Sequence, residues 1–349
     1  MKTIINTKNV KNLFVSSLLF FTVTGMVAQE EEEERKALSI SGSVDAYYKT
    51  NLSSTDVSSQ APGSSFADET GFALGMANII ASYETGKVGA VADLVFGPRG
   101  DAAVGGDVLN VNQLYTYWNV SEGTKLTLGR FNTFLGYEVI SPTANFNYST
   151  SYLFSYGPFS HVGLKADFAI SEDLSLMLAV MNVTDENFNG TSTGSVPGAY
   201  SLGAQLGYAG QFLNLYYDGN AKLGFEIDYT GGLDLSDDFF LGINAAYQDN
   251  DGVGFYGAAL YPQLTTSESF TIGLRGEYFS EMGDYGAIGT GVEDSSVFAV
   301  TLTGSYKVEN LIIKPELRLD SASDEAFLDN DLSGTKSLSS FLIAAIYSF

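Results

Sequence analysis

Apolar and polar residues alternate with a period of two along much of this chain, most regularly towards its C-terminal end. In residues 311–320 one face carries leucine and isoleucine, and the opposite face carries the charged residues Lys314, Glu316, Arg318 and Asp320. Successive side chains of a β-strand point to opposite faces. An apolar face about ten residues long, opposite a charged face, is typical of a strand that separates lipid from water. The pattern therefore predicts membrane-spanning strands.

Sixteen segments of this kind are predicted. They cover residues 38–48, 72–84, 87–96, 109–120, 124–131, 161–170, 174–183, 199–209, 212–218, 221–231, 239–248, 253–262, 269–280, 296–307, 311–320 and 338–349. Fourteen or eighteen strands remain open as alternatives, because 72–84 and 109–120 alternate poorly.

The connections between these segments differ in length in a regular way. Every second connection is short, such as 121–123, and most of the others are long, such as 132–160. Short periplasmic turns, long extracellular loops and an even number of strands are typical of outer-membrane barrels. The predicted fold is an all-β, antiparallel, up-and-down transmembrane barrel.

The N-terminal region predicts export. Lys2, Lys8 and Lys11 precede the apolar stretch 13–23, and a small residue, Ala28, follows it. This order is typical of a cleaved secretory signal peptide, here residues 1–28. Residues 29–37 contain five consecutive glutamates and predict a disordered periplasmic tail, with a docking tail as the alternative. The barrel is expected over 38–349.

The composition excludes several classes of protein. The chain has no cysteine, which excludes disulfides and thiolate metal sites. It carries 41 acidic and 17 basic residues, for a net charge of −24. This balance argues against nucleic acid as a partner, because phosphate binding depends on Lys and Arg.

The predicted strand number indicates what the barrel interior contains. Barrels of 16–18 strands leave an aqueous channel. Charged residues on the polar faces are therefore expected to line this channel, unless they pair into salt bridges that only brace the wall. They are Lys165, Asp167, Lys222, Glu226, Asp228, Arg275, Glu277, Lys307, Lys314, Glu316, Arg318 and Asp320.

The connection 132–160 is unusual for a surface loop. It is rich in Tyr, Phe, Asn and Ser, and its one charged residue is Glu138. A long apolar and aromatic loop usually packs against another surface. We expect it to fold into the barrel and narrow the pore, with Glu138 near the constriction. The alternatives are a cap over the barrel or an additional hairpin.

The same region resembles a known family. The resemblance is dense over about 125–170 and rests on the stretches Gly129–Phe131, Gly136–Pro142, Asn145–Ser149 and Gly157–Gly163. These stretches are similar to the OmpL-like putative beta-barrel porin family of Gram-negative outer membranes. The resemblance implies an outer-membrane porin, and it transfers no catalytic residue and no defined substrate.

No catalytic, cofactor-binding or metal site is predicted. His161 is the single histidine and lacks a nucleophile motif beside it, so a hydrolase is disfavoured. The acidic stretches 329–331 and 249–252 resemble fragments of calcium loops but lack the full ligand pattern.

The sequence thus predicts a diffusion porin for small hydrophilic solutes or ions, weakly selective for cations because of its acidic excess. The expected partners are outer-membrane lipid and the barrel-assembly machinery, which would recognise the C-terminal Phe349. A homotrimer is expected by analogy with many porins. The alternative function is a non-conducting barrel that displays extracellular loops for adhesion or complex assembly.

Overall fold

In the computed structural model, residues 37–56, 60, 66–104, 110–183 and 199–349 are described. The predicted signal peptide and the acidic stretch after it lie outside these residues, apart from Ala37. Among the described residues, no helix is both long enough and apolar enough to cross a membrane.

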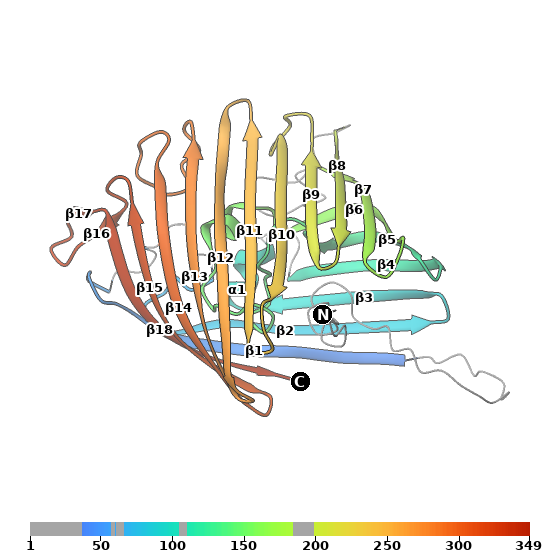
Figure 1. Ribbon diagram of the computed structural model, residues 1–349, viewed down its shortest axis with the longest axis horizontal. Helices are drawn as coiled ribbons and strands as arrows, with labels where there is room; N and C mark the ends of the chain where they lie inside the picture. Colours follow the sequence, from blue (N-terminus) through green and yellow to red (C-terminus); the bar gives the residue numbers. More distant parts are fainter. Residues whose placement is uncertain (1–36, 57–59, 61–65, 105–109, 184–198) are drawn as a thin grey trace, which may run out of the picture.

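Sixteen antiparallel strands form one closed barrel, in which each strand pairs with its neighbours in the sequence and β1 closes the ring with β18 (Figure 1). The strands of the first half are β1 (Ala37–Asn51), β2 (Gly71–Thr85), β3 (Val88–Phe96), β4 (Val111–Ser121), β5 (Thr124–Asn132), β6 (Ser160–Ala169), β7 (Leu174–Asn182) and β8 (Tyr200–Tyr208). Those of the second half are β9 (Gln211–Tyr217), β10 (Phe225–Asp234), β11 (Phe239–Asn250), β12 (Val253–Ser267), β13 (Phe270–Met282), β14 (Ser296–Val308), β15 (Leu311–Ala322) and β18 (Ser337–Ser348).

The remaining elements are short and lie in the connections. Helix α1 (Pro98–Val104) follows β3, helix α2 (Tyr152–Tyr156) lies between β5 and β6, and a small hairpin of β16 (Phe327–Leu328) and β17 (Gly334–Thr335) lies between β15 and β18. The alternation of short and long connections predicted from the sequence is present, except that only residues 251–252 join β11 and β12 at a position where a long loop is expected. The strand number of sixteen is confirmed.

The predicted start of the tenth strand at residue 221 is wrong, and the correction moves a candidate residue. Strand β10 begins at Phe225, so Lys222 lies in the connection 218–224 and is not part of the wall. The physical reason is the carboxylate of Asp218, which accepts hydrogen bonds from the backbone N–H groups of residues 221–224. These N–H groups are therefore paired within a turn and not along a strand.

Two-residue turns with left-handed backbone join several strands. Ala209 and Gly210 have φ of 50° and 81°, and Asp251 and Gly252 have φ of 56° and 90°. Positive φ at both central residues is the requirement of the type I′ turn, whose twist matches that of paired strands. The short connection between β11 and β12 thus follows from its Asp-Gly pair.

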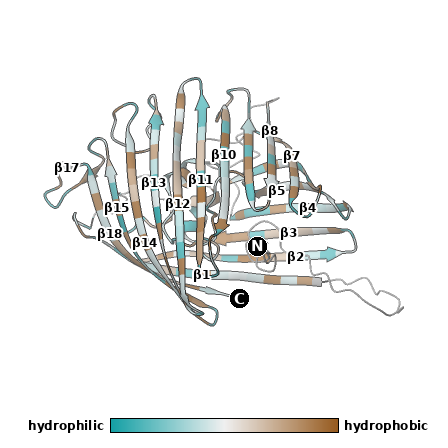
Figure 2. Cartoon of the chain, viewed as in Figure 1, coloured by the Kyte–Doolittle hydropathy of each residue, from teal (hydrophilic) through white to brown (hydrophobic). Residues whose placement is uncertain are grey.

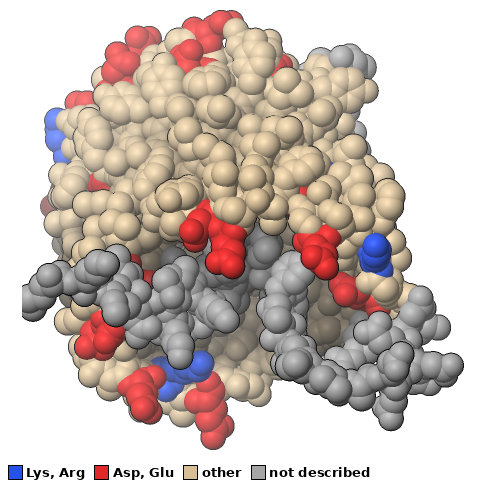
Figure 3. All heavy atoms as spheres, turned by 45° about the vertical axis from the view of Figure 1, so that its right-hand side comes forward, with Lys and Arg blue, Asp and Glu red and all other residues tan. Residues whose placement is uncertain are grey.

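Hydrophobic and hydrophilic bands follow one another along the strands (Figure 2), and the side chains on the two faces of the wall differ in chemistry, as the alternation predicts. Outward side chains such as Phe72 and Leu317 are apolar and 92% and 48% exposed. Inward side chains on the same strands are buried, including Glu316 and Arg318 on either side of Leu317. On the face in Figure 3, acidic residues lie along the top edge and in a band across the middle of the view, with a broad belt of uncharged residues between these two groups. This belt suits the hydrocarbon layer of a membrane.

The outward face of β15 provides a test of membrane insertion. Replacing Leu317, which lies near the middle of the strand, with Arg is expected to cost about 2–4 kcal/mol of folding free energy, because it places a charge at the bilayer midplane. The matched control Ser321→Arg, on the same face near the strand end, is expected to cost about 0–1 kcal/mol. Urea titrations of the protein in lipid vesicles measure both, and equal losses at the two positions would contradict this orientation.

Candidate functional site

The connection between β5 and β6, residues 133–159, contacts the interior face of the wall on several sides; we call it the inner loop. Its Gly136 N–H donates to Asp228 on β10 (3.0 Å), and its Tyr148 hydroxyl donates to Asp45 on β1 (2.5 Å). Many of its aromatic and aliphatic side chains are buried, with Tyr148 and Tyr152 fully so. The inner loop therefore spans part of the space that the barrel encloses.

Glycines on the wall make room for the rings of this loop. A Cβ atom at Gly242 on β11 would lie 2.2 Å from the hydroxyl oxygen of Tyr137, and one at Gly273 on β13 would lie 2.4 Å from the Phe146 ring. Tyr137 also stacks on Tyr261 of β12, with 4.4 Å between the ring centroids. A larger residue at either position would therefore force the ring of the inner loop to shift.

Wall carboxylates hold the backbone N–H groups of the inner loop. Glu277 on β13 accepts from the N–H groups of Tyr152 (3.0 Å) and Leu153 (2.8 Å), which begin α2. Glu316 on β15 accepts from the N–H groups of Tyr148 (2.9 Å) and Ser149 (3.3 Å). The first N–H groups of a helix have no partner within the helix, so an anion beside them is stabilising.

Wall arginines hold the backbone carbonyls of the same segment. Arg275 on β13, which has no exposed surface, forms an ion pair with Glu138 (2.7 Å) and donates to the carbonyl of Ser149 (2.6 Å). Arg318 on β15 donates to the carbonyl of Thr150 (2.8 Å) and forms an ion pair with Asp320 (2.9 Å). Both guanidinium groups are therefore engaged by the loop or the wall.

Two further cations contact the loop from other elements. Lys314 on β15 donates to the carbonyls of Pro142 (2.9 Å) and Asn145. Arg99 in α1 donates to the carbonyls of Ile140 (2.9 Å) and Tyr148 (3.3 Å). Arg99 was not among the residues predicted from the sequence. The sequence feature that indicates its helix is Pro98, because proline is favoured at the first position of a helix.

The C-terminal end of α2 is fixed by a tyrosine. The Tyr156 hydroxyl donates to the carbonyl of Ala287, in the connection between β13 and β14, at 2.5 Å. Burial raises the pKa of Tyr156 to about 12. The hydroxyl therefore keeps its proton at neutral pH and remains a donor to Ala287.

The predicted pore-lining residues fall into distinct environments. One group contacts the inner loop or belongs to it: Glu138, Asp228, Arg275, Glu277, Lys314, Glu316 and Arg318. Asp320 is buried against Arg318. Glu226 is buried on β10, and its Oε2 atom has no hydrogen-bond partner among the described residues.

Other predicted residues remain accessible to water. Lys165 and Asp167 on β6 form an ion pair at 3.3 Å, and their side chains are 26% and 32% exposed. Lys307 is exposed near the end of β14. On the neighbouring strands, Lys125 of β5 lies over the ring of Tyr117 of β4, with its Nζ 4.4 Å from the ring centroid. We call this part of β4–β6, with Lys125, Lys165 and Asp167, the open wall. The sequence predicted Lys165 and Asp167 as pore-lining residues but not Lys125.

His161 is enclosed by other side chains. Its ring has no exposed surface, lies within hydrogen-bond distance of the Thr133 hydroxyl (2.9 Å) and stacks on Tyr216. These contacts give it a structural role at the start of β6. Among the described residues there is no group of three or more His, Cys, Asp or Glu arranged to hold a metal ion.

The ion pair between Arg275 and Glu138 can be tested by a double-mutant cycle. Arg275→Met is expected to destabilise the folded barrel by about 3–5 kcal/mol, because it leaves a buried carboxylate unpaired. Adding Glu138→Gln is expected to recover part of that loss. The control Lys336→Met removes an exposed partner of Asp324 and is expected to change stability by about 0–1 kcal/mol.

Stability is measured by urea titration in lipid vesicles. Equal losses in Arg275→Met and Lys336→Met would show that the buried pair does not hold the inner loop.

Comparisons with known proteins agree with this architecture. Residues 37–349 match the model of the family described as "Putative beta-barrel porin-2, OmpL-like". The chain is similar in structure to an anion-selective porin from Comamonas acidovorans, with 11% identity, a TM-score of 0.56, and coverage of 90% of this chain and 100% of that chain. It is also similar to a mutant of the Rh. blastica porin, with 10% identity, a TM-score of 0.50, and coverage of 90% and 100%. No curated protein matches the sequence. At these identities the structural likeness concerns the fold alone.

Proposed function

This chain belongs to the family of OmpL-like β-barrel porins, and from that premise we propose that it is a passive pore for small hydrophilic solutes or ions in the outer membrane. The observation that carries the proposal is the closed barrel of sixteen strands, with charged side chains on its open wall that remain accessible to water. A barrel of this strand number is wide enough for an aqueous channel.

The inner loop sets the width of the proposed pore. It is anchored to β13 and β15 through Glu277, Glu316 and the two arginines, and this side of the interior is therefore filled. The partly exposed residues Lys165 and Asp167 lie on β6, away from these anchors. The proposed route for solutes runs between the inner loop and the open wall.

Weak cation selectivity is the finer part of the proposal. Its support is the net charge of −24 and the exposed acids at the ends of the barrel. A ring of acids at a pore mouth raises the local concentration of cations. The open wall itself carries charges of both signs, so the preference is expected to be small.

Liposome swelling in sugar solutions tests the pore. The wild-type protein is expected to admit small sugars, and a variant in which a short Gly-Ser linker replaces 140–155 is expected to admit them faster and to pass larger ones. The matched control removes 329–332, the tip of the β16–β17 connection, and is expected to behave as wild type. A folded 140–155 deletion with an unchanged rate would contradict the role of the inner loop. No swelling with any folded variant would favour the non-conducting, loop-displaying barrel.

Reversal potentials in a KCl gradient test the selectivity. The expected result is a K⁺ preference that weakens as the salt concentration rises, because the Debye length shortens from about 10 Å at 0.1 M to about 3 Å at 1 M. An anion preference at low salt would refute this part of the proposal.

A further inference from the structure

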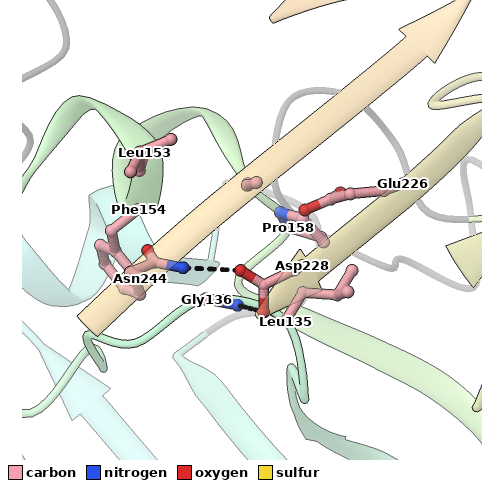
Figure 4. Close-up of a pocket in the computed structure, with 10 residues that line it drawn as sticks. Leu135, Gly136, Leu153, Phe154, Pro158, Glu226, Asp228 and Asn244 are labelled. Atoms are coloured by element: carbon pink, nitrogen blue, oxygen red, sulfur yellow. Dashed lines mark hydrogen bonds between the residues drawn. The ribbon is translucent and has the colours of Figure 1, made fainter. Parts of the chain in front are cut away.

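Lys125 on β5 is a half-buried lysine of the open wall. Within the described part of the chain its ammonium group forms no hydrogen bond and no ion pair, and its Nζ atom lies over the Tyr117 ring. Asp228, by contrast, accepts hydrogen bonds from the Asn244 side chain and the Gly136 N–H (Figure 4). A ring face attracts a cation, but it leaves the three N–H donors of an ammonium group for other acceptors.

The Tyr117 ring is fixed against the wall. Tyr117 on β4 pairs in register with Gly89 on β3, where a Cβ atom would lie 2.3 Å from the ring. Its hydroxyl donates to the carboxylate of Glu84 on β2. Two strands, β3 and β4, separate Glu84 from Lys125. The ring therefore holds the Lys125 ammonium in place, and the nearest acid on that side is already engaged by Tyr117.

A second lysine lies beside Lys125 on the same face of the wall. Lys125 pairs in register with Asp167 on β6, and Lys165 lies two residues from Asp167. Diagonal neighbours of this kind are about 7–8 Å apart, within reach of one another's long side chains. Lys165 forms the ion pair with Asp167 at 3.3 Å, and its Nζ atom lies 5.4 Å from the centroid of the Phe131 ring. One carboxylate thus serves two ammonium groups, and the three side chains together carry a charge of +1.

Thr127 adds a neutral donor between the two lysines. It pairs in register with Lys165 on one side and with Tyr117 on the other. Thr127 is 2% exposed, and its hydroxyl has no hydrogen-bond partner among the described residues. Buried polar groups are normally hydrogen-bonded, so an unused hydroxyl beside two cations indicates a missing acceptor. The cluster therefore lacks one negatively charged acceptor.

We propose that Lys125, Lys165 and Thr127 bind the carboxylate group of small organic acids that pass along the open wall. The inference rests on the proposed pore and names a class of solute for it. One carboxylate balances the charge of +1, and its two oxygens can accept from both ammonium groups or from the hydroxyl. A phosphate carries about two negative charges and would meet Asp167 with the second, so it is disfavoured.

The site and the weak cation preference of the pore act at different ranges. The acids at the ends of the barrel act on every ion that approaches, whereas the lysines act on a carboxylate at hydrogen-bond distance. Asp167 competes for the same ammonium groups, which keeps the binding weak. Weak binding is required of a site on a diffusion route, because the solute must leave as well as enter.

Saturation-transfer difference NMR of the refolded full-length protein in a non-ionic detergent tests the site. The probes are propionate and its neutral analogue propionamide, and propionate is expected to bind more tightly. Lys125→Gln and Lys165→Gln are each expected to raise the Kd for propionate about tenfold, because each removes a charge-assisted hydrogen bond. The matched control Lys307→Gln, which removes an exposed lysine of β14, is expected to keep the wild-type Kd.

Asp167→Asn provides a test with the opposite sign. It removes the competing carboxylate and is expected to lower the Kd for propionate. An unchanged or higher Kd in this variant, or equal Kd values in Lys125→Gln and Lys307→Gln, would overturn the proposal. Equal binding of propionate and propionamide by the wild type would do the same.

The binding measurement does not depend on conduction, so the site and the pore can fail separately. Propionate binding by a protein that admits no sugar into liposomes would support the site and contradict the pore. Sugar uptake without preferential propionate binding would support the pore and contradict the site.

Discussion

The structure depends on the pairing of charged wall side chains with the backbone of the inner loop. Buried N–H and C=O groups must be hydrogen-bonded, and an irregular segment satisfies only some of them within itself. Here carboxylates of β13 and β15 take N–H groups of residues 148–153, and arginines of the same strands take carbonyls of residues 149–150. The interior charges of this wall thus replace the hydrogen-bond ladder that a regular element would provide.

This pairing changes what the interior charges do. A charged side chain that faces an aqueous lumen contacts water and solutes, but Arg275 and Glu277 are fully buried and contact the loop. On that side of the barrel the charges fix the position of the loop. Solutes would meet the residues that remain accessible on β4–β6, where Lys165 and Asp167 lie.

The barrel itself could be predicted from the sequence because one physical contrast repeats along it. Lipid outside and polar or buried surroundings inside impose the same period on every strand, as Leu317 between Glu316 and Arg318 illustrates. The error at Lys222 arose where a side chain, Asp218, takes over backbone hydrogen bonds, and the alternation carries no signal for that. Strand ends are therefore less predictable than strands.

The contacts of the interior charged residues were less predictable from the sequence than the face of the wall on which these residues lie. Alternation indicates which face a residue occupies, but it does not indicate what lies opposite. The ion pair between Arg275 and Glu138 joins residues 137 positions apart, and the contact of Arg99 with Ile140 joins a short helix to a loop.

The account rests on a water-filled route that the inner loop narrows without closing. Single-channel recording of the purified, refolded wild-type protein in planar lipid bilayers tests this claim most directly. The account predicts discrete conductance steps of uniform size. A silent bilayer, with protein shown to be folded and inserted, would contradict it.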